Sequence, residues 1–174
     1  MNTRRIIVSV LTASALALPA NPASVLAALG GSSPATGSLT VQASVAARCN
    51  VSTTTINFGS YDPTVATPTD QNGAVTIQCT KGTVATIDLG NGGNLSSGTR
   101  RMIGAGLGEF LNYGLFTDSP GGTPWGTGIT GGTTVGYTAP NASPTNLTVY
   151  GRMPAGQDVS VDSYQDTVVV TATF

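Results

Sequence analysis

The acidic side chains are the residues of this sequence that could most readily carry out chemistry. The 174 residues include eight Asp and Glu and no histidine, which excludes catalytic triads built on histidine and histidine-ligated zinc. Asp158, Asp162 and Asp166 recur every four residues, but in a strand this spacing spreads them along one face. A glycosidase would need two converging carboxylates, and the Asp-x-Asp-x-Asp-Gly pattern of a calcium loop is missing. We therefore expect no enzyme, no cofactor and no metal site.

A few other side chains could bind a ligand. Trp125, in the loop sequence GGTPWGTG, could stack on a sugar or anchor its own loop. Arg100 and Arg101 could grip an anion or donate to nearby loop carbonyls. We expect Trp125 to anchor its loop and the two arginines to donate to loop carbonyls. We also expect Asp62, in YDP, to bond the backbone of its turn.

The first 28 residues have the pattern of a secretory signal peptide. A short basic start is followed by an uncharged apolar run at 6–18, and small residues offer a cleavage site near Ala27 or Ala28. The alternative, a membrane anchor, is disfavoured because the run is too short for a comfortable transmembrane helix. The mature chain would then hold about 146 residues, enough for one domain with a real core.

The charge of the mature chain excludes some partners. Removing Arg4 and Arg5 leaves five basic residues against eight acidic ones, a net charge of −3. Charged residues make up only 9% of the sequence, well below the usual quarter. So little basic charge cannot hold nucleic acid through its phosphates, nor offer a cationic patch to anionic lipid. We expect no nucleic-acid partner.

The two cysteines, Cys49 and Cys79, are too far apart for a CxxC redox or metal motif. An even cysteine count in a secreted chain predicts one disulfide bond. Closing a loop of this length would stabilise the fold by about 3–4 kcal/mol in the chain-entropy description. The alternative is a pair of buried free thiols.

Short alternating runs separated by turns predict strands throughout the mature chain and no long amphipathic helix. The expected strands are 49–58, 74–79, 83–89, 109–118, 145–154 and 163–174. The Asn72-Gly73 pair ahead of the second run predicts a turn. Strands of this length and spacing indicate an all-β fold, either a β-sandwich or a β-barrel.

A further strand pattern lies at the front of the mature chain, after a Gly/Ser/Pro-rich stretch. Its apolar residues occur at every second position, namely Leu39, Val41, Ala43, Val45 and Ala47. Six strands from Cys49 onward would leave a seven-stranded sandwich one strand short, with an unpaired edge and an open groove. This front segment, residues 37–47, is the spare strand.

Three motifs together carry a family resemblance: CNVSTTTINFGSYDP at 49–63, VYGRMPAGQ at 149–157 and YQDTVVVTATF at 164–174. Over nearly the whole mature chain, the sequence resembles the spore coat protein U family, the archaic chaperone–usher pilin subunits. One departure is Asp162, where family members commonly have glycine; we expect only a local loop effect.

The resemblance implies an incomplete immunoglobulin-like β-sandwich of about six strands plus an N-terminal donor strand. The implied organisation is a signal peptide at 1–28, a flexible linker and donor strand at 29–48, and the pilin domain at 49–174. A periplasmic chaperone would lend a strand to the groove, and at the outer-membrane usher the donor strand of the next subunit would replace it.

The same resemblance implies which residues meet in that contact. The inserted residues would be Leu39, Val41, Ala43, Val45 and Ala47. The acceptor groove, which is also the chaperone contact, would be lined in part by Val168, Val170, Ala172 and Phe174.

The resemblance thus implies a secreted structural subunit that passes through the periplasm to a cell-surface pilus or fibre. It would polymerise with copies of itself or with related pilins and support adhesion or biofilm formation. Two alternatives remain open at this point: a soluble secreted carbohydrate-binding β-sandwich using Trp125 and Tyr137, and a structural layer around a spore or resting cell.

Overall fold

The computed structural model describes residues 34–174, so the predicted signal peptide lies outside the described residues. The chain divides into two units, Met1–Gln42 and Ala43–Phe174. In the described part of the first unit, residues 34–42, no helix or strand is assigned and every residue is exposed. The second unit, called the sandwich unit below, holds all the strands that the structure describes.

The sandwich unit is built of short antiparallel strands. They are β1 (Cys49–Thr53), β2 (Thr69–Cys79), β3 (Val84–Leu89), β4 (Arg100–Gly104), β5 (Phe110–Phe116), β6 (Val135–Thr138), β7 (Thr145–Met153), β8 (Tyr164–Gln165) and β9 (Val170–Thr173). No helix long and apolar enough to cross a membrane occurs in residues 34–174.

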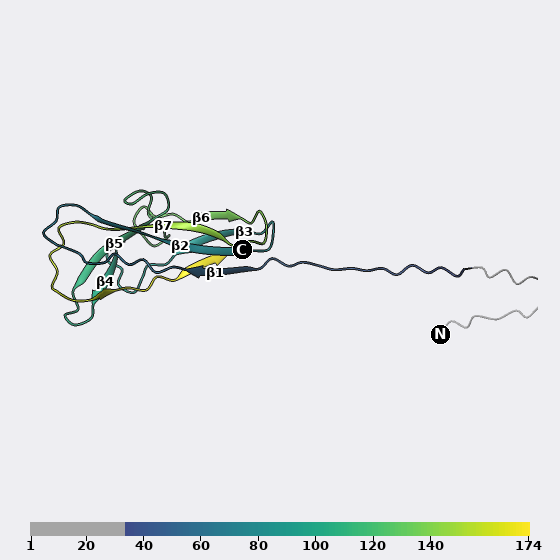
Figure 1. The fold of residues 1–174 in the computed structure, drawn as a ribbon, viewed down its shortest axis with the longest axis horizontal. Coiled ribbons are helices and arrows are strands. Elements are labelled where there is room, and N and C mark those ends of the chain that lie inside the picture. Colours follow the sequence, from purple (N-terminus) through teal and green to yellow (C-terminus); the bar gives the residue numbers. More distant parts are fainter. Residues whose placement is uncertain (1–33) are drawn as a thin grey trace, which may run out of the picture. The chain divides into compact units, whose positions relative to one another are not determined.

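These strands form two sheets (Figure 1). The larger sheet has six strands in the order β1-β2-β7-β5-β4-β8, and the smaller has three in the order β6-β3-β9. Every pairing is antiparallel, and the longest runs between β2 and β7. The all-β prediction is confirmed.

The core lies between the sheets and follows the two-residue period of the strands. Its members alternate along each strand: Val75, Ile77 and Cys79 in β2, Ile87 and Leu89 in β3, and Leu111, Tyr113 and Leu115 in β5. The intervening residues on these strands are more exposed than the core positions. Alternation therefore decides which face of each strand is buried.

The predicted turn at Asn72-Gly73 is wrong. Both residues lie inside β2, where they pair with Tyr150 and Val149 of β7. A Cβ atom built on Gly73 would lie 2.5 Å from Cγ1 of Ile56. The lack of a Cβ atom at Gly73 therefore leaves room for the side chain of Ile56 to cross the strand. The Asn-Gly pair makes no hairpin.

Other strand predictions differ from the structure in their bounds. The run predicted at 49–58 is strand only as far as Thr53, and the run at 163–174 is divided into β8 and β9, which belong to different sheets. β4 and β6 were not predicted. β4 begins with two arginines, and β6 has only four residues after a glycine-rich loop, so neither has an evident strand pattern.

Candidate functional site, a groove between two sheet edges

Two edge strands of the sandwich unit meet without pairing. β1 is the outermost strand of the larger sheet, with β2 as its neighbour, and β9 is the outermost strand of the smaller sheet, with β3 as its neighbour. β9, the yellow strand that ends near the C-terminus, lies next to β1 (Figure 1). No strand in the described part of the chain pairs with the outer side of either.

The outer edge of β9 presents unpaired backbone groups. The carbonyl of Val169, just before β9, accepts a bond of 2.8 Å from the N–H of Gly90. Successive residues of a strand direct their backbone groups to opposite sides. The groups of Val168, Val170 and Ala172 therefore point away from β3, toward the place where another strand could pair.

Beside this edge the surface is hollowed, and we call the whole hollow the groove. One part, of about 300 Å³, lies between Thr53–Phe58 on one side and Asp166–Val170 on the other. A second part, of about 520 Å³, continues between residues 56–63 and 159–164. Ile56, Phe58 and Met102 line both parts. The floor is largely apolar and includes Val75, Leu89, Leu111, Leu115, Val149 and Met153.

The structure places the four expected groove residues differently. Val168 and Val170 are half-buried and line the smaller part of the groove. Ala172 is half-buried and packs against the core. Phe174 is 57% exposed and lines neither part.

The opposite wall of the groove, at Ile56 and Phe58, was not foreseen. These two residues have the alternation of a strand, so the sequence indicated that they face one side. The sequence does not show that this side is the one that faces the groove.

The apolar residues of the front segment are exposed. Leu39, Val41 and Val45 have exposed fractions of 89%, 84% and 83%. Ala43 and Ala47 are also exposed, and no strand is assigned from residue 34 to Arg48. The alternation predicted for a strand is present, but in the described chain these residues have no strand partner.

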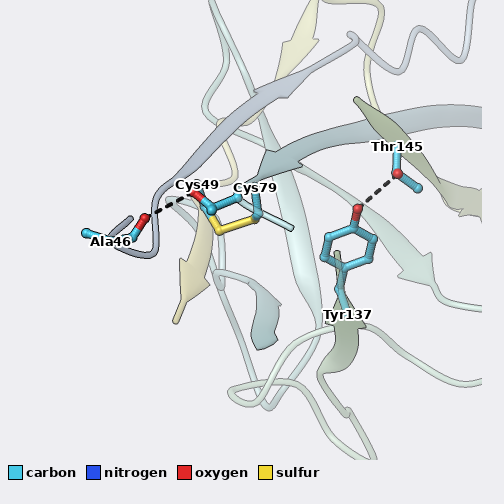
Figure 2. The surroundings of a disulfide bond; sticks show 6 residues. Ala46, Cys49, Cys79, Tyr137 and Thr145 are labelled. Carbon is cyan, nitrogen blue, oxygen red and sulfur yellow. Dashed lines mark hydrogen bonds between the residues drawn. A yellow bond between two sulfur atoms is a disulfide. The ribbon is translucent and has the colours of Figure 1, made fainter. Parts of the chain in front are cut away.

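The end of the front segment is tied to the sandwich unit near a disulfide (Figure 2). Cys49 and Cys79 lie directly opposite each other in the β1–β2 ladder and are joined, with an S–S distance of 2.02 Å. Just before Cys49, the carbonyl of Ala46 accepts a hydrogen bond from the hydroxyl of Thr80, and the carbonyl of Arg48 accepts one from its N–H. A disulfide in this fold is typical of proteins outside the cytoplasm.

The candidate ligand-binding aromatics have structural roles. Trp125 is 1% exposed, and its Nε1 donates to the carbonyl of Ile87. Tyr137 is half-buried, with its hydroxyl 3.0 Å from Oγ1 of Thr145 (Figure 2). Trp125 is the loop anchor that we expected, and it cannot serve as an exposed platform for a sugar.

The two adjacent arginines hold loops. Arg100 is 1% exposed and donates to the carbonyls of Leu89, Gly90 and Trp125 over 2.7–2.8 Å. Burial lowers the pKa of its guanidinium. Arg101 donates from Nε to the carbonyl of Asn94. Neither arrangement resembles an anion site, which agrees with the structural role expected of both.

The carboxylates likewise bond to backbone. Asp62 accepts from the N–H and the hydroxyl of Thr64, as its turn position predicted, and the hydroxyl contributes most to lowering its pKa. Asp162 accepts from the N–H groups of Gly106 and Leu107, and the bond from Gly106 contributes most to lowering its pKa. No cluster of three or more metal-ligating side chains occurs within the described range 34–174.

An antiparallel sandwich in which two edge strands meet without pairing belongs to the class of incomplete sandwiches when it also has a groove with an apolar floor and a spare apolar strand pattern. Comparison gives the family: residues 35–171 match the Spore Coat Protein U domain, and the chain is a member of that family. It is 34% identical over 189 aligned positions to Protein U of Myxococcus xanthus, and the alignment covers all of both chains. The resemblance seen in the motifs is therefore confirmed.

A solved structure supports the fold. The chain is similar, with a TM-score of 0.55 and 23% identity, to a chain in the crystal structure of the CsuC–CsuE chaperone–tip adhesion subunit pre-assembly complex from archaic chaperone–usher Csu pili of Acinetobacter baumannii. The match covers 75% of this chain and 40% of that chain. The family is one of coat proteins, which are structural, and the chain is not an enzyme.

Proposed function

We propose that this chain is a structural subunit of a secreted fibre in which residues 37–47 of one copy fill the groove of the next. The observation that carries the proposal is the complementarity of two unpaired features. The groove has an apolar floor and is bordered by the free edge of β9, and the front segment has exposed apolar residues at every second position. A strand of that period can pair along an edge while burying one face.

The stability of such a contact follows from the residues that it would bury. Leu39, Val41 and Val45 would each contribute about 1.5–3 kcal/mol on burial, and the two alanines less. Each backbone hydrogen bond to β9 would add about 0.5–1.5 kcal/mol. The contact would also cover an edge that otherwise invites unspecific pairing. The link would be close to permanent.

The donor should come from another copy. The bonds of Ala46 and Arg48 to Thr80 continue the direction of β1 beyond Cys49. No glycine, proline, asparagine or aspartate occurs from Ser38 to Cys49 to favour a tight reversal. A head-to-tail contact of this kind does not close on itself and generates a filament.

The partners follow by analogy with the Csu complex, whose tip subunit is bound to a chaperone. We propose residues 1–28 as the signal peptide, 29–48 as linker and donor strand, and 49–174 as the pilin domain. A periplasmic chaperone would occupy the groove beside Val168, Val170, Ala172 and Phe174 in transit. An outer-membrane usher would then release the chain to a surface fibre that supports adhesion or biofilm formation.

The test compares two full-length variants that carry the same added charge on opposite faces of the front segment. Val41→Asp/Val45→Asp places two carboxylates on the face that would be buried, and Gln42→Asp/Ser44→Asp places them on the other face. We expect the parent and the second variant to form ladders in unboiled SDS gels, and the first to give no ladder. Equal ladders from both variants, or monomers from all three chains, would overturn the proposal.

A spore or cell coat layer is the second candidate, because the family is defined by a spore coat domain. Both candidates use the same contact between copies, so they differ in the shape of the assembly. Electron microscopy of the purified ladder material distinguishes them: thin filaments favour the fibre, and sheets or shells favour the coat layer.

A further inference from the structure

The segment that forms one wall of the groove crosses from one sheet to the other. β8 pairs with β4 in the larger sheet, and β9 pairs with β3 in the smaller one. Residues 166–169, between these two strands, belong to no ladder. Their described backbone attachment is the bond from the N–H of Gly90 to the carbonyl of Val169. Something other than strand pairing must hold this wall in place.

The carboxylate of Asp166 supplies that attachment. Its Oδ1 accepts from the N–H of Gly93 over 2.7 Å and from its own neighbour Thr167 over 2.8 Å. Its Oδ2 accepts from the hydroxyl of Tyr113 over 2.6 Å. One side chain thereby joins the wall to the loop after β3 and to the centre of β5.

The loop after β3 is shaped to reach this carboxylate. Gly92 has a φ of +75°, and a Cβ atom there would collide with Oδ2 of Asp166. On the other side of the loop, Arg100 holds the carbonyls of Leu89 and Gly90. The buried guanidinium of Arg100 therefore fixes the start of the loop, and the carboxylate of Asp166 fixes it at Gly93.

Asp166 and Tyr113 also form a polar pair in the lining of the smaller part of the groove. Tyr113 is 6% exposed, and burial, followed by the hydrogen bond to Asp166, raises the pKa of its phenol. The phenol therefore stays protonated and able to donate at neutral pH. An arriving strand would cover a hydrogen bond that is already formed.

We propose that Asp166 is the positioning residue of the groove: its bonds to Tyr113 and Gly93 hold residues 167–170 so that the edge of β9 is ready for an incoming strand. The role rests on the proposed function, because it concerns the same groove. The carboxylate touches the wall, the loop and β5, and it acts on the incoming strand through the placement of Val168 and Val170.

The test uses the full chain carrying Val41→Asp/Val45→Asp, so that the groove stays empty. Into this parent we introduce Asp166→Asn, which keeps the shape of the side chain and removes its charge. Tyr113→Phe is the second variant, which removes one bond while keeping the ring in the core. Asp158→Asn is the matched control, since Asp158 is an exposed carboxylate of the same type.

Two measurements separate positioning from general stability. Hydrogen exchange of the Gly90 and Gly93 amides reports the attachment of the wall, and amides of the β2–β7 ladder report the rest of the fold. Uptake of a synthetic peptide of residues 37–48 reports strand capture. We expect Asp166→Asn to speed exchange at both glycines and to slow peptide uptake by roughly tenfold, the effect of losing a charge-assisted bond. The β2–β7 amides should not change.

Tyr113→Phe should reproduce part of this effect. The double variant should be no worse than Asp166→Asn, because both changes act on the same Tyr113–Asp166 bond. Exchange and uptake equal to those of the Asp158→Asn control would overturn the positioning role while leaving the proposed function intact. A parent chain that takes up no peptide would overturn both.

Discussion

At the scale of single residues, Gly73 shows how a local pattern can mislead. Asn-Gly favours a two-residue turn, yet here it lies inside the ladder between β2 and β7. The side chain of Ile56 crosses over the glycine and then lines the groove. The absence of a Cβ atom at residue 73 therefore helps to set the wall formed by Ile56.

Gly73→Ala should destabilise the domain by about 1–3 kcal/mol, the usual cost of adding volume to a packed site. A Cβ atom there lies 2.5 Å from Cγ1 of Ile56, so the isoleucine must move. Urea unfolding measures the loss, and the peptide of residues 37–48 should bind more weakly. Gly136→Ala is the control, because a Cβ atom there meets nothing within 4 Å. Equal stability of the two variants would contradict this account.

At the scale of elements, the predictable strands are those that bury every second residue. The runs predicted at 83–89, 109–118 and 145–154 correspond to β3, β5 and β7, which pair on both sides and bury alternate residues. Alternation is a property of the segment itself, so a sequence displays it. The division of the last run into β8 and β9 depends on which sheet accepts each part, and no local pattern encodes this.

The groove was predictable only in part, for the same reason. The count of strands indicated that one was missing, and the alternation of the last run indicated that Val168 and Val170 face inward. Ile56 and Phe58 lie in one segment, far along the chain from Met102. Their convergence depends on the packing of both sheets, which lies beyond what one sequence shows. The carboxylate of Asp166 was noted for its spacing, but its contacts with Tyr113 and Gly93 required the fold.

The disulfide acts at the scale of the element that it fastens. β1 has a neighbour on one side only, so the Cys49–Cys79 bond holds an edge strand whose other side is open. Replacing both cysteines by serine should cost about 3–4 kcal/mol in the chain-entropy description for a separation of 30 residues. Urea unfolding with and without reductant measures this. The double-serine chain should be indifferent to reductant, and an indifferent parent would show that the bond contributes nothing.

At the scale of the whole molecule, the charges predict a broad plateau of stability. Hydrogen bonds lower the pKa of several carboxylates, namely Asp62, Asp70, Glu109, Asp118 and Asp162. A lowered pKa contributes stability above the unfolded value and loses it as the pH falls. The raised pKa of Tyr113, caused mainly by burial, contributes stability below its ordinary value of 10.0 and loses it as the pH rises. No histidine titrates in between.

The urea midpoint should therefore be nearly constant from about pH 5 to about pH 10 and fall on either side. Asp62→Asn combined with Asp162→Asn should make the acid decline shallower, because both carboxylates accept backbone N–H bonds. Unfolding followed across this pH range measures both effects. A transition between pH 6 and pH 8 would contradict the account.

The position of the disulfide also decides which parts of a subunit would carry mechanical load. In a fibre of the proposed kind, tension enters a subunit through the segment that ends at Ala47 and reaches Cys49 two residues later. From there the S–S bond offers a covalent path straight to Cys79, at the end of β2. Residues 50–78 form a closed loop beside that path, so a pull at Cys49 cannot extend them. Ile56 and Phe58, one wall of the groove, lie within this loop. A subunit under tension would keep the shape with which it grips its neighbour.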